Sequence, residues 1–145
     1  MKPTLILTIG YPRSGKSTWA KTQDCPRVEP DAIRLAIHGT LWNAELEPKV
    51  WETAKIMVKA LFNAGHDKVI LDSTAITEAR RAEWNDEAWN VEYKVFNTSA
   101  QTCKERAIQC GREYLVPVIE KMEGILELPT SLGSTQTQHT SHELK

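Results

Sequence analysis

Short apolar runs rich in β-forming residues recur along the chain, separated by stretches in which apolar residues follow helical spacing. Residues 4–9 (TLILTI) and 68–72 (KVILD) have the pattern of buried strands, and residues 91–96 (VEYKVF) alternate with period two. A shorter strand is expected at 27–29. Strands separated by helices favour parallel pairing with right-handed crossovers, so the pattern predicts an α/β fold: a parallel four-stranded sheet flanked by helices.

The helical stretches are defined by their apolar spacing and by signals at their ends. Val50, Ala54 and Val58 share one face of the longest stretch, and Gly65 provides a stop after it. Pro30 suits a first helical turn. Helices are expected at 16–22, 30–38, 45–64, 77–89, 100–109 and 116–126.

The chain of 145 residues has room for one ordinary domain with its own core. All the patterned elements fall within residues 1–128. Residues 129–145 are mostly Ser, Thr, Gln, Gly and His, a composition that buries too little apolar surface to order itself. We therefore expect one domain at 1–128 and a flexible C-terminal tail at 129–145.

Composition narrows the class of protein further. With 41% hydrophobic and 26% charged residues, the chain resembles an average globular protein, and the apolar run at 5–9 is too short to span a membrane. A cytoplasmic protein with no membrane partner is therefore expected. The net charge of −1 gives no whole-surface attraction to nucleic acid, so such binding requires a local basic patch.

Residues 10–17 (GYPRSGKS) match the pattern G-x-x-x-x-G-K-S, between a predicted strand and a predicted helix. Glycines let backbone N–H groups close around phosphate oxygens, and a helix N-terminus favours the anion. Lys16 would supply positive charge to the β- and γ-phosphates, and the Ser17 hydroxyl would bind Mg²⁺. The alternative is a glycine-rich turn with a chance lysine. The loop residues expected to bind ATP or another nucleoside triphosphate are Gly10, Pro12, Arg13, Ser14, Gly15, Lys16, Ser17 and Thr18.

Asp72 ends a predicted strand of the same sheet, at the edge where ligands of open α/β sheets bind. A carboxylate there is expected to act on Mg²⁺ through water, together with Ser17. The alternative role is a cap toward Ser73 and Thr74 in the following turn, where aspartate is common.

Asp31 and Arg34 lie one turn apart at the start of a predicted helix beyond the second strand. This position suits a general base that accepts the proton of an attacking hydroxyl, with Arg34 binding an anionic group of the acceptor. Spacing alone favours the alternative, an acid at a helix start with an exposed arginine partner.

Arg106 and Arg112 lie in the segment 104–114, between the last two predicted helices. Arginines at such a position are typical of a helical lid that closes on a triphosphate and neutralises charge in the transition state. Solvated surface arginines are the alternative.

The sequence resembles the kinase domain of the phage polynucleotide 5′-hydroxyl kinase, within the small P-loop kinases that include zeta-toxin-like kinases. Residues 5–10 with 15–20, and residues 79–84 (ARRAEW) followed by 91–96, carry the similarity. It extends over most of the chain, and Asp31, Arg34, Asp72, Arg106 and Val116-Pro117 also match.

The resemblance implies that Asp31 is the general base, that Arg34 holds a phosphate of the acceptor strand, and that Asp72 lies beside the reaction centre. Two positions depart from the family pattern. Arg13 replaces a small residue in the loop, and Cys110 replaces an arginine expected four residues after Arg106. Arg112 takes that arginine's role only if the lid loop carries an insertion.

The expected function is ATP-dependent transfer of a phosphoryl group to a hydroxyl, with a single-stranded nucleic acid or nucleotide as acceptor and its 5′-hydroxyl as the reacting group. Lys16, Asp31, Arg34 and Arg112 are the expected catalytic residues. A kinase of a nucleoside or other small metabolite is the first alternative. A non-catalytic nucleotide-binding module is the alternative from another class.

Overall fold

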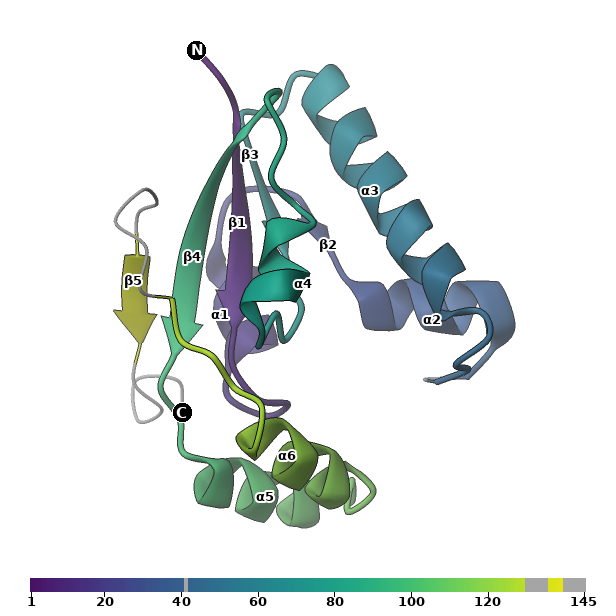
Figure 1. The fold of residues 1–145 in the computed structure, drawn as a ribbon, viewed down its shortest axis with the longest axis vertical. Helices are drawn as coiled ribbons and strands as arrows, with labels where there is room; N and C mark the ends of the chain where they lie inside the picture. Colours follow the sequence, from purple (N-terminus) through teal and green to yellow (C-terminus); the bar gives the residue numbers. More distant parts are fainter. Residues whose placement is uncertain (41, 130–135, 140–145) are drawn as a thin grey trace.

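The computed structural model describes residues 1–40, 42–129 and 136–139, of which residues 136–139 are described by their backbone alone. A parallel sheet with the strand order β2-β3-β1-β4-β5 forms its centre (Figure 1). The four strands expected from the sequence are all present, so the predicted fold class is confirmed. The strands are β1 (Thr4–Ile9), β2 (Arg27–Val28), β3 (Lys68–Leu71), β4 (Asn90–Phe96) and β5 (Gln136–His139).

Helices connect the strands, as expected for parallel pairing. Helices α5 and α6 lie together beyond the end of the sheet toward which β1 and β4 point, whereas α2 and α3 lie beside β2 and β3 (Figure 1). The helices are α1 (Lys16–Thr22), α2 (Pro30–His38), α3 (Glu47–Asn63), α4 (Glu78–Ala82), α5 (Ala100–Gln109) and α6 (Leu115–Glu123).

The register of the sheet brings the ends of three strands to one edge. Leu7 of β1 pairs with Leu71 at the end of β3, and Ile9 of β1 pairs with Val95 near the end of β4. The loop that begins at Gly10 and the loop that begins at Asp72 therefore start side by side. This carboxyl edge is where open α/β sheets bind their ligands.

The main core lies between the sheet and α3. Leu5 and Leu7 of β1 pack with Val50, Ala54 and Val58 of α3, and all five are fully buried. The apolar spacing that predicts the long helix therefore identifies its buried face correctly. Trp84 and Trp89, on the segment after α4, belong to the same cluster.

The helix expected at 77–89 is wrong beyond Ala82, because α4 is a single short turn from Glu78 to Ala82. Trp84 and Trp89 are both buried, and the Trp89 indole nitrogen donates to the Trp84 carbonyl at 2.8 Å. The Asp86 carboxylate accepts from the backbone N–H of Ala88 at 2.8 Å, which favours a turn over a helix. Burial of two indoles thus overrides the helical pattern.

The strand β5 was not expected. It falls within the segment 129–145 that the sequence analysis treats as a tail, and it pairs in parallel with β4 from Tyr93 to Phe96. An exposed edge strand offers unpaired backbone groups, and any nearby extended segment can pair with it whatever its side chains. Backbone pairing of this kind leaves no apolar signal in the sequence.

No helix in the described part of the chain is long and apolar enough to cross a membrane.

We predict that Trp84→Ala lowers the free energy of unfolding by about 3–5 kcal/mol, as expected for truncation of a buried aromatic ring. Trp84 is 2% exposed and lies in the main core. Urea unfolding of both proteins measures the change. Ile56→Ala is the control, because Ile56 is 61% exposed on α3 and its loss should change stability by less than about 0.5 kcal/mol. Equal effects of the two substitutions would show that this core assignment is wrong.

Candidate active site

The loop between β1 and α1 is a tight turn whose backbone accepts few side chains. Gly15 has φ 105° and Arg13 has φ 68°, so both are in the left-handed region. A Cβ added to Gly10 would lie 2.7 Å from Ser14 Oγ and 3.1 Å from Phe96 Cβ. Gly10 is therefore required by the close packing of this turn. Arg13, which is not glycine, carries some backbone strain in its left-handed conformation.

The Lys16 side chain turns back under this loop. Its Nζ donates to the carbonyls of Gly10 at 2.9 Å and Tyr11 at 2.6 Å, and lies 3.5 Å from Ser14 Oγ. Burial lowers the pKa of Lys16 from 10.5 to about 8, although Asp72, Cys103 and Asp31 act in the opposite direction. A cation with little access to water gains strongly from a nearby anion, as a phosphate-binding lysine must.

Ser17 and Asp72 meet across the two loops. The Ser17 hydroxyl donates to Asp72 Oδ2 at 2.7 Å. Burial raises the pKa of Asp72, against the effects of the Ser17 hydrogen bond and the Lys16 charge, so a further cation beside the carboxylate would be favourable. Because Mg²⁺ is usually held by one or two protein oxygens with water and phosphate, these two residues fit it.

Within the described residues no group of three or more His, Cys, Asp or Glu side chains is placed to bind a metal ion by itself. A magnesium ion at Ser17 and Asp72 would therefore depend on phosphate oxygens and water for its other ligands.

Two buried threonines hold the loops in place, and neither was predicted as a site residue from the sequence. Thr8 Oγ1 donates toward the carbonyls of Leu71 at 3.2 Å and Ser73 at 2.8 Å, and accepts from the Ser73 backbone N–H at 3.0 Å. Thr98, just after β4, donates to the Ser14 carbonyl at 2.9 Å. A polar residue within the apolar strand 4–9 was the available signal for Thr8; nothing in the sequence marks Thr98.

Asp31, at the start of α2, belongs to the same edge of the sheet. Its charge contributes to the pKa of Lys16, and its own side chain is 75% exposed. Arg34 Nη1 donates to Asp31 Oδ1 at 2.7 Å, as the one-turn spacing predicts. Because β2 ends opposite Leu71 of β3, Asp31 lies at the same edge of the sheet as the loop lysine and is accessible to a second substrate.

Glu47, at the start of α3, is a further partner of Arg34 that the sequence analysis missed. Arg34 Nε donates to both oxygens of Glu47 at 3.1 Å, and Nη2 donates to Oε1. Burial alone would lower the pKa of Arg34, but hydrogen bonds to Glu47 and Asp31 outweigh it and raise the pKa. The guanidinium thus stays charged between two carboxylates.

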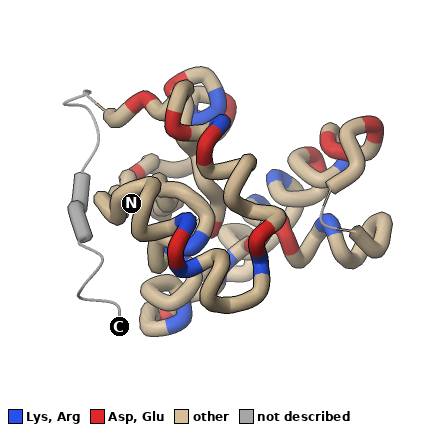
Figure 2. Tube along the Cα trace, turned by 90° about the horizontal axis from the view of Figure 1, so that it is seen from below, with Lys and Arg blue, Asp and Glu red and all other residues tan. Residues whose placement is uncertain are grey.

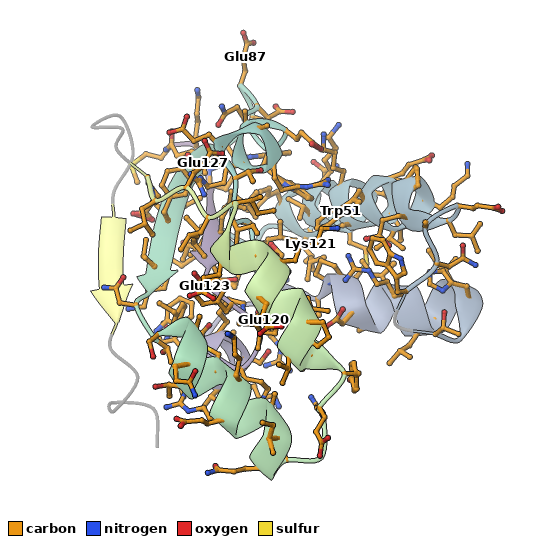
Figure 3. The ribbon with its side chains drawn as sticks, turned by 60° about the horizontal axis from the view of Figure 1, so that its bottom comes forward. Trp51, Glu87, Glu120, Lys121, Glu123 and Glu127 are labelled. Atoms are coloured by element: carbon orange, nitrogen blue, oxygen red, sulfur yellow. The ribbon has the colours of Figure 1, made fainter. Side chains whose placement is uncertain are left out.

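An indole on α3 joins this cluster to α4. The guanidinium carbon of Arg34 lies 5.6 Å from the centre of the Trp51 ring, and that of Arg80 lies 4.8 Å from it. Figure 3 shows Trp51 on α3. Arg81, the neighbour of Arg80, is buried and donates to the Ala75 carbonyl at 2.7 Å.

Residues 104–114, the segment expected to be a lid, run from the second half of α5 to the start of α6, and the two helices pack together. Their apolar faces pack with Tyr11 of the loop, and Lys104 of α5 lies 3.5 Å from Glu120 and 3.6 Å from Glu123 of α6 (Figure 3). Arg106 Nη1 donates to the Arg13 carbonyl at 3.2 Å, which brings this arginine to the loop.

The remaining predicted residues differ in their exposure. Arg112 is exposed in the turn between α5 and α6. Arg13 and Thr18 are exposed, Pro12 is half-buried and Ser14 is fully buried.

A sequence profile of AAA domains matches residues 5–122. No curated protein sequence matches the chain. A chain in the structure of the Pnkp1/Rnl/Hen1 complex is 28% identical, with a TM-score of 0.64, and the match covers 72% of this chain and 39% of that one. A chain in the Pnkp1/Rnl/Hen1 RNA repair complex is 21% identical, with a TM-score of 0.61, and the match covers 92% and 50%. The present chain therefore spans half or less of those two chains.

The fold also resembles that of the APS kinase CysC of Mycobacterium tuberculosis, solved with AMPPNP and APS. The identity is 15% and the TM-score 0.67, and the match covers 94% of this chain and 88% of that one. Together the matches show a fold shared by small P-loop kinases, whose acceptors differ.

We predict that the stability of the wild type relative to Lys16→Met is constant below about pH 8 and increases as the pH rises from about 8 toward 10. The pKa of Lys16 is about 8 in the folded protein, where the ammonium group is buried. It is 10.5 when the group is exposed, as in the unfolded chain. The unfolded chain therefore binds more protons in this range, and deprotonation relieves the cost of burying the charge. Urea unfolding of both proteins at each pH measures the difference in the free energy of unfolding. The contributions of the other titrating groups cancel because both proteins contain them. A constant or falling difference would contradict the buried, charged state of Lys16.

Proposed function

We propose that this chain, which belongs to the AAA domain family, is a kinase that transfers the γ-phosphoryl group of ATP to the 5′-hydroxyl of a polynucleotide or oligonucleotide. The family and the fold support a phosphotransferase with a nucleotide donor. One observation carries the proposal further: β2 ends at Val28, which pairs with Leu71 just before Asp72, so Asp31 at the start of α2 follows a neighbouring strand end and is itself exposed. A base and a phosphate-binding cation are thus available on one edge of the sheet.

The donor side uses the loop and its surroundings. We assign the triphosphate to the backbone of residues 10–18, with Lys16 exchanging its bonds to the Gly10 and Tyr11 carbonyls for bonds to phosphate. Ser17 and Asp72 would hold Mg²⁺, which when bound supplies positive charge to the phosphate oxygens. Arg106, already at the Arg13 carbonyl, is assigned to the phosphates as well, and Arg112 is assigned to them in a closed lid.

The acceptor side uses α2. Asp31 would accept the proton of the attacking hydroxyl, while Arg34 holds its carboxylate through the 2.7 Å hydrogen bond and keeps it oriented. Glu47 holds Arg34 in turn. Little covalent chemistry is required of the protein, because phosphoryl transfer depends mainly on positioning and charge neutralisation.

The polynucleotide acceptor is favoured by the 28% identity to a chain of the Pnkp1/Rnl/Hen1 complex and by the arginines near Trp51. Figure 2 shows basic and acidic residues interspersed along the trace, so attraction of a polymer must be local. A small anionic metabolite is the alternative acceptor, supported by the fold shared with the APS kinase along 88% of that chain.

We predict that Asp31→Asn lowers turnover on a 5′-hydroxyl oligonucleotide by about 10²–10⁴-fold while changing ATP affinity less than about threefold. The substitution keeps the shape of the side chain but removes the base, and Asp31 is not assigned to the triphosphate. Labelled phosphoryl transfer measures turnover, and a fluorescent ATP analogue measures binding.

Asp24→Asn is the matched control, since Asp24 is also an exposed acid but lies on the turn after α1. Its turnover should equal that of the wild type. Normal turnover of Asp31→Asn would contradict the assignment of the base. ATP binding by the wild type without transfer to any hydroxyl would favour the non-catalytic nucleotide-binding module.

A further inference from the structure

Three arginines lie near the acceptor side of the site, and the structure gives each a different environment. Arg81 is 2% exposed, and its Nη1 donates to the carbonyl of Ala75, a non-glycine residue with φ 44° in the loop after Asp72. Arg81 is therefore committed to the shape of that loop. An acceptor in solution has no access to a guanidinium buried in this way.

Arg34 is accessible only in part and is already surrounded by negative charge. Its side chain is 14% exposed, Glu47 accepts from two of its nitrogens, and Asp31 accepts from the third. One positive charge between two carboxylates leaves the cluster with a net charge of about −1. An approaching phosphate would meet that net negative charge, so Arg34 alone is a weak site for an acceptor phosphate.

Arg80 has neither restriction. Its side chain is 42% exposed, and its ion pair with Glu83 is long, at 3.5 Å, and itself exposed. Exposed ion pairs of this kind contribute little and exchange easily for another anion. The guanidinium lies 4.8 Å from the centre of the Trp51 ring, so contact with the indole limits its freedom.

Arg80 is also close to the base through a continuous set of contacts. Trp51 contacts the guanidinium of Arg80 and, at 5.6 Å, that of Arg34. Arg34 in turn donates to Asp31 at 2.7 Å. Arg80 is therefore separated from the cluster that holds Asp31 by a single indole ring.

We propose that Arg80, supported on Trp51, binds a backbone phosphate of the acceptor strand and so determines the preference for a polynucleotide, while Arg34 serves to position Asp31. This inference rests on the proposed 5′-hydroxyl kinase function. Arg80 supplies the positive charge that the Asp31–Arg34–Glu47 cluster lacks. The planar guanidinium suits a phosphodiester because it can donate two hydrogen bonds to it.

The test compares two acceptors that differ only in the charge of their linkages. One is a short 5′-hydroxyl oligonucleotide, and the other has the same sequence with a neutral methylphosphonate at each linkage. We expect Arg80→Ala to raise the KM of the native oligonucleotide about tenfold with little change in kcat. On the methylphosphonate acceptor the same substitution should change the KM less than about twofold.

Glu83→Gln and Arg80→Lys are the matched variants. Removing the Glu83 charge frees Arg80, so the KM of the native oligonucleotide should fall by about twofold, opposite in sign to Arg80→Ala. Arg80→Lys keeps the charge and should recover part of the loss. Thermal unfolding of each variant shows whether any effect comes from lost packing on Trp51.

Two results would overturn the inference. The first is an unchanged KM in a folded Arg80→Ala protein. The second is an equal increase on the charged and the neutral acceptor, which would indicate a structural effect. If the wild-type enzyme transferred phosphate to neither oligonucleotide, the proposed function would fail and this inference with it. Failure of the inference alone leaves wild-type transfer intact.

Discussion

The hydroxyl of Thr8 fixes the geometry on which the rest of the site depends. It joins the end of β1 to the end of β3 through bonds to Leu71 and Ser73, so the loop after each strand starts from a fixed place. Asp72 lies between those two partners, and this position allows its carboxylate to accept from Ser17 at 2.7 Å. Because Thr8 is fully buried, these bonds do not compete with water.

The lysine of the loop is held in a state that favours anion binding. Its ammonium group is nearly buried and bonds to two carbonyls, which carry only partial charges, so its pKa falls to about 8. A phosphate that replaced the carbonyls would supply the full negative charge that the site lacks. On the acceptor side negative charge is in excess, because two carboxylates surround the single positive charge of Arg34. The site thus has a donor side that attracts anions and an acceptor side that depends on a further cation.

Local periodicity and short spacing could predict strands β1 to β4, the loop at 10–17 and the pairing of Asp31 with Arg34. The contacts of Glu47 and Trp51 with Arg34 could not, since they join α2 to α3 through tertiary packing. The length of α4 was overestimated because burial of Trp84 and Trp89 outweighs helical spacing. The strand β5 joins the sheet by pairing with β4, and no apolar pattern at 136–139 indicates it.

The most direct test of the central claim is transfer of labelled phosphate from ATP by the wild-type protein, with Mg²⁺, to competing acceptors. These are a 5′-hydroxyl oligonucleotide, the same oligonucleotide with a 5′-phosphate, the free nucleoside and a sugar acid. We predict that label appears on the 5′-hydroxyl oligonucleotide with kcat/KM at least about a hundredfold above that for either small acceptor, and not on the 5′-phosphorylated oligonucleotide. Label on a small acceptor in preference to the oligonucleotide would contradict the claim.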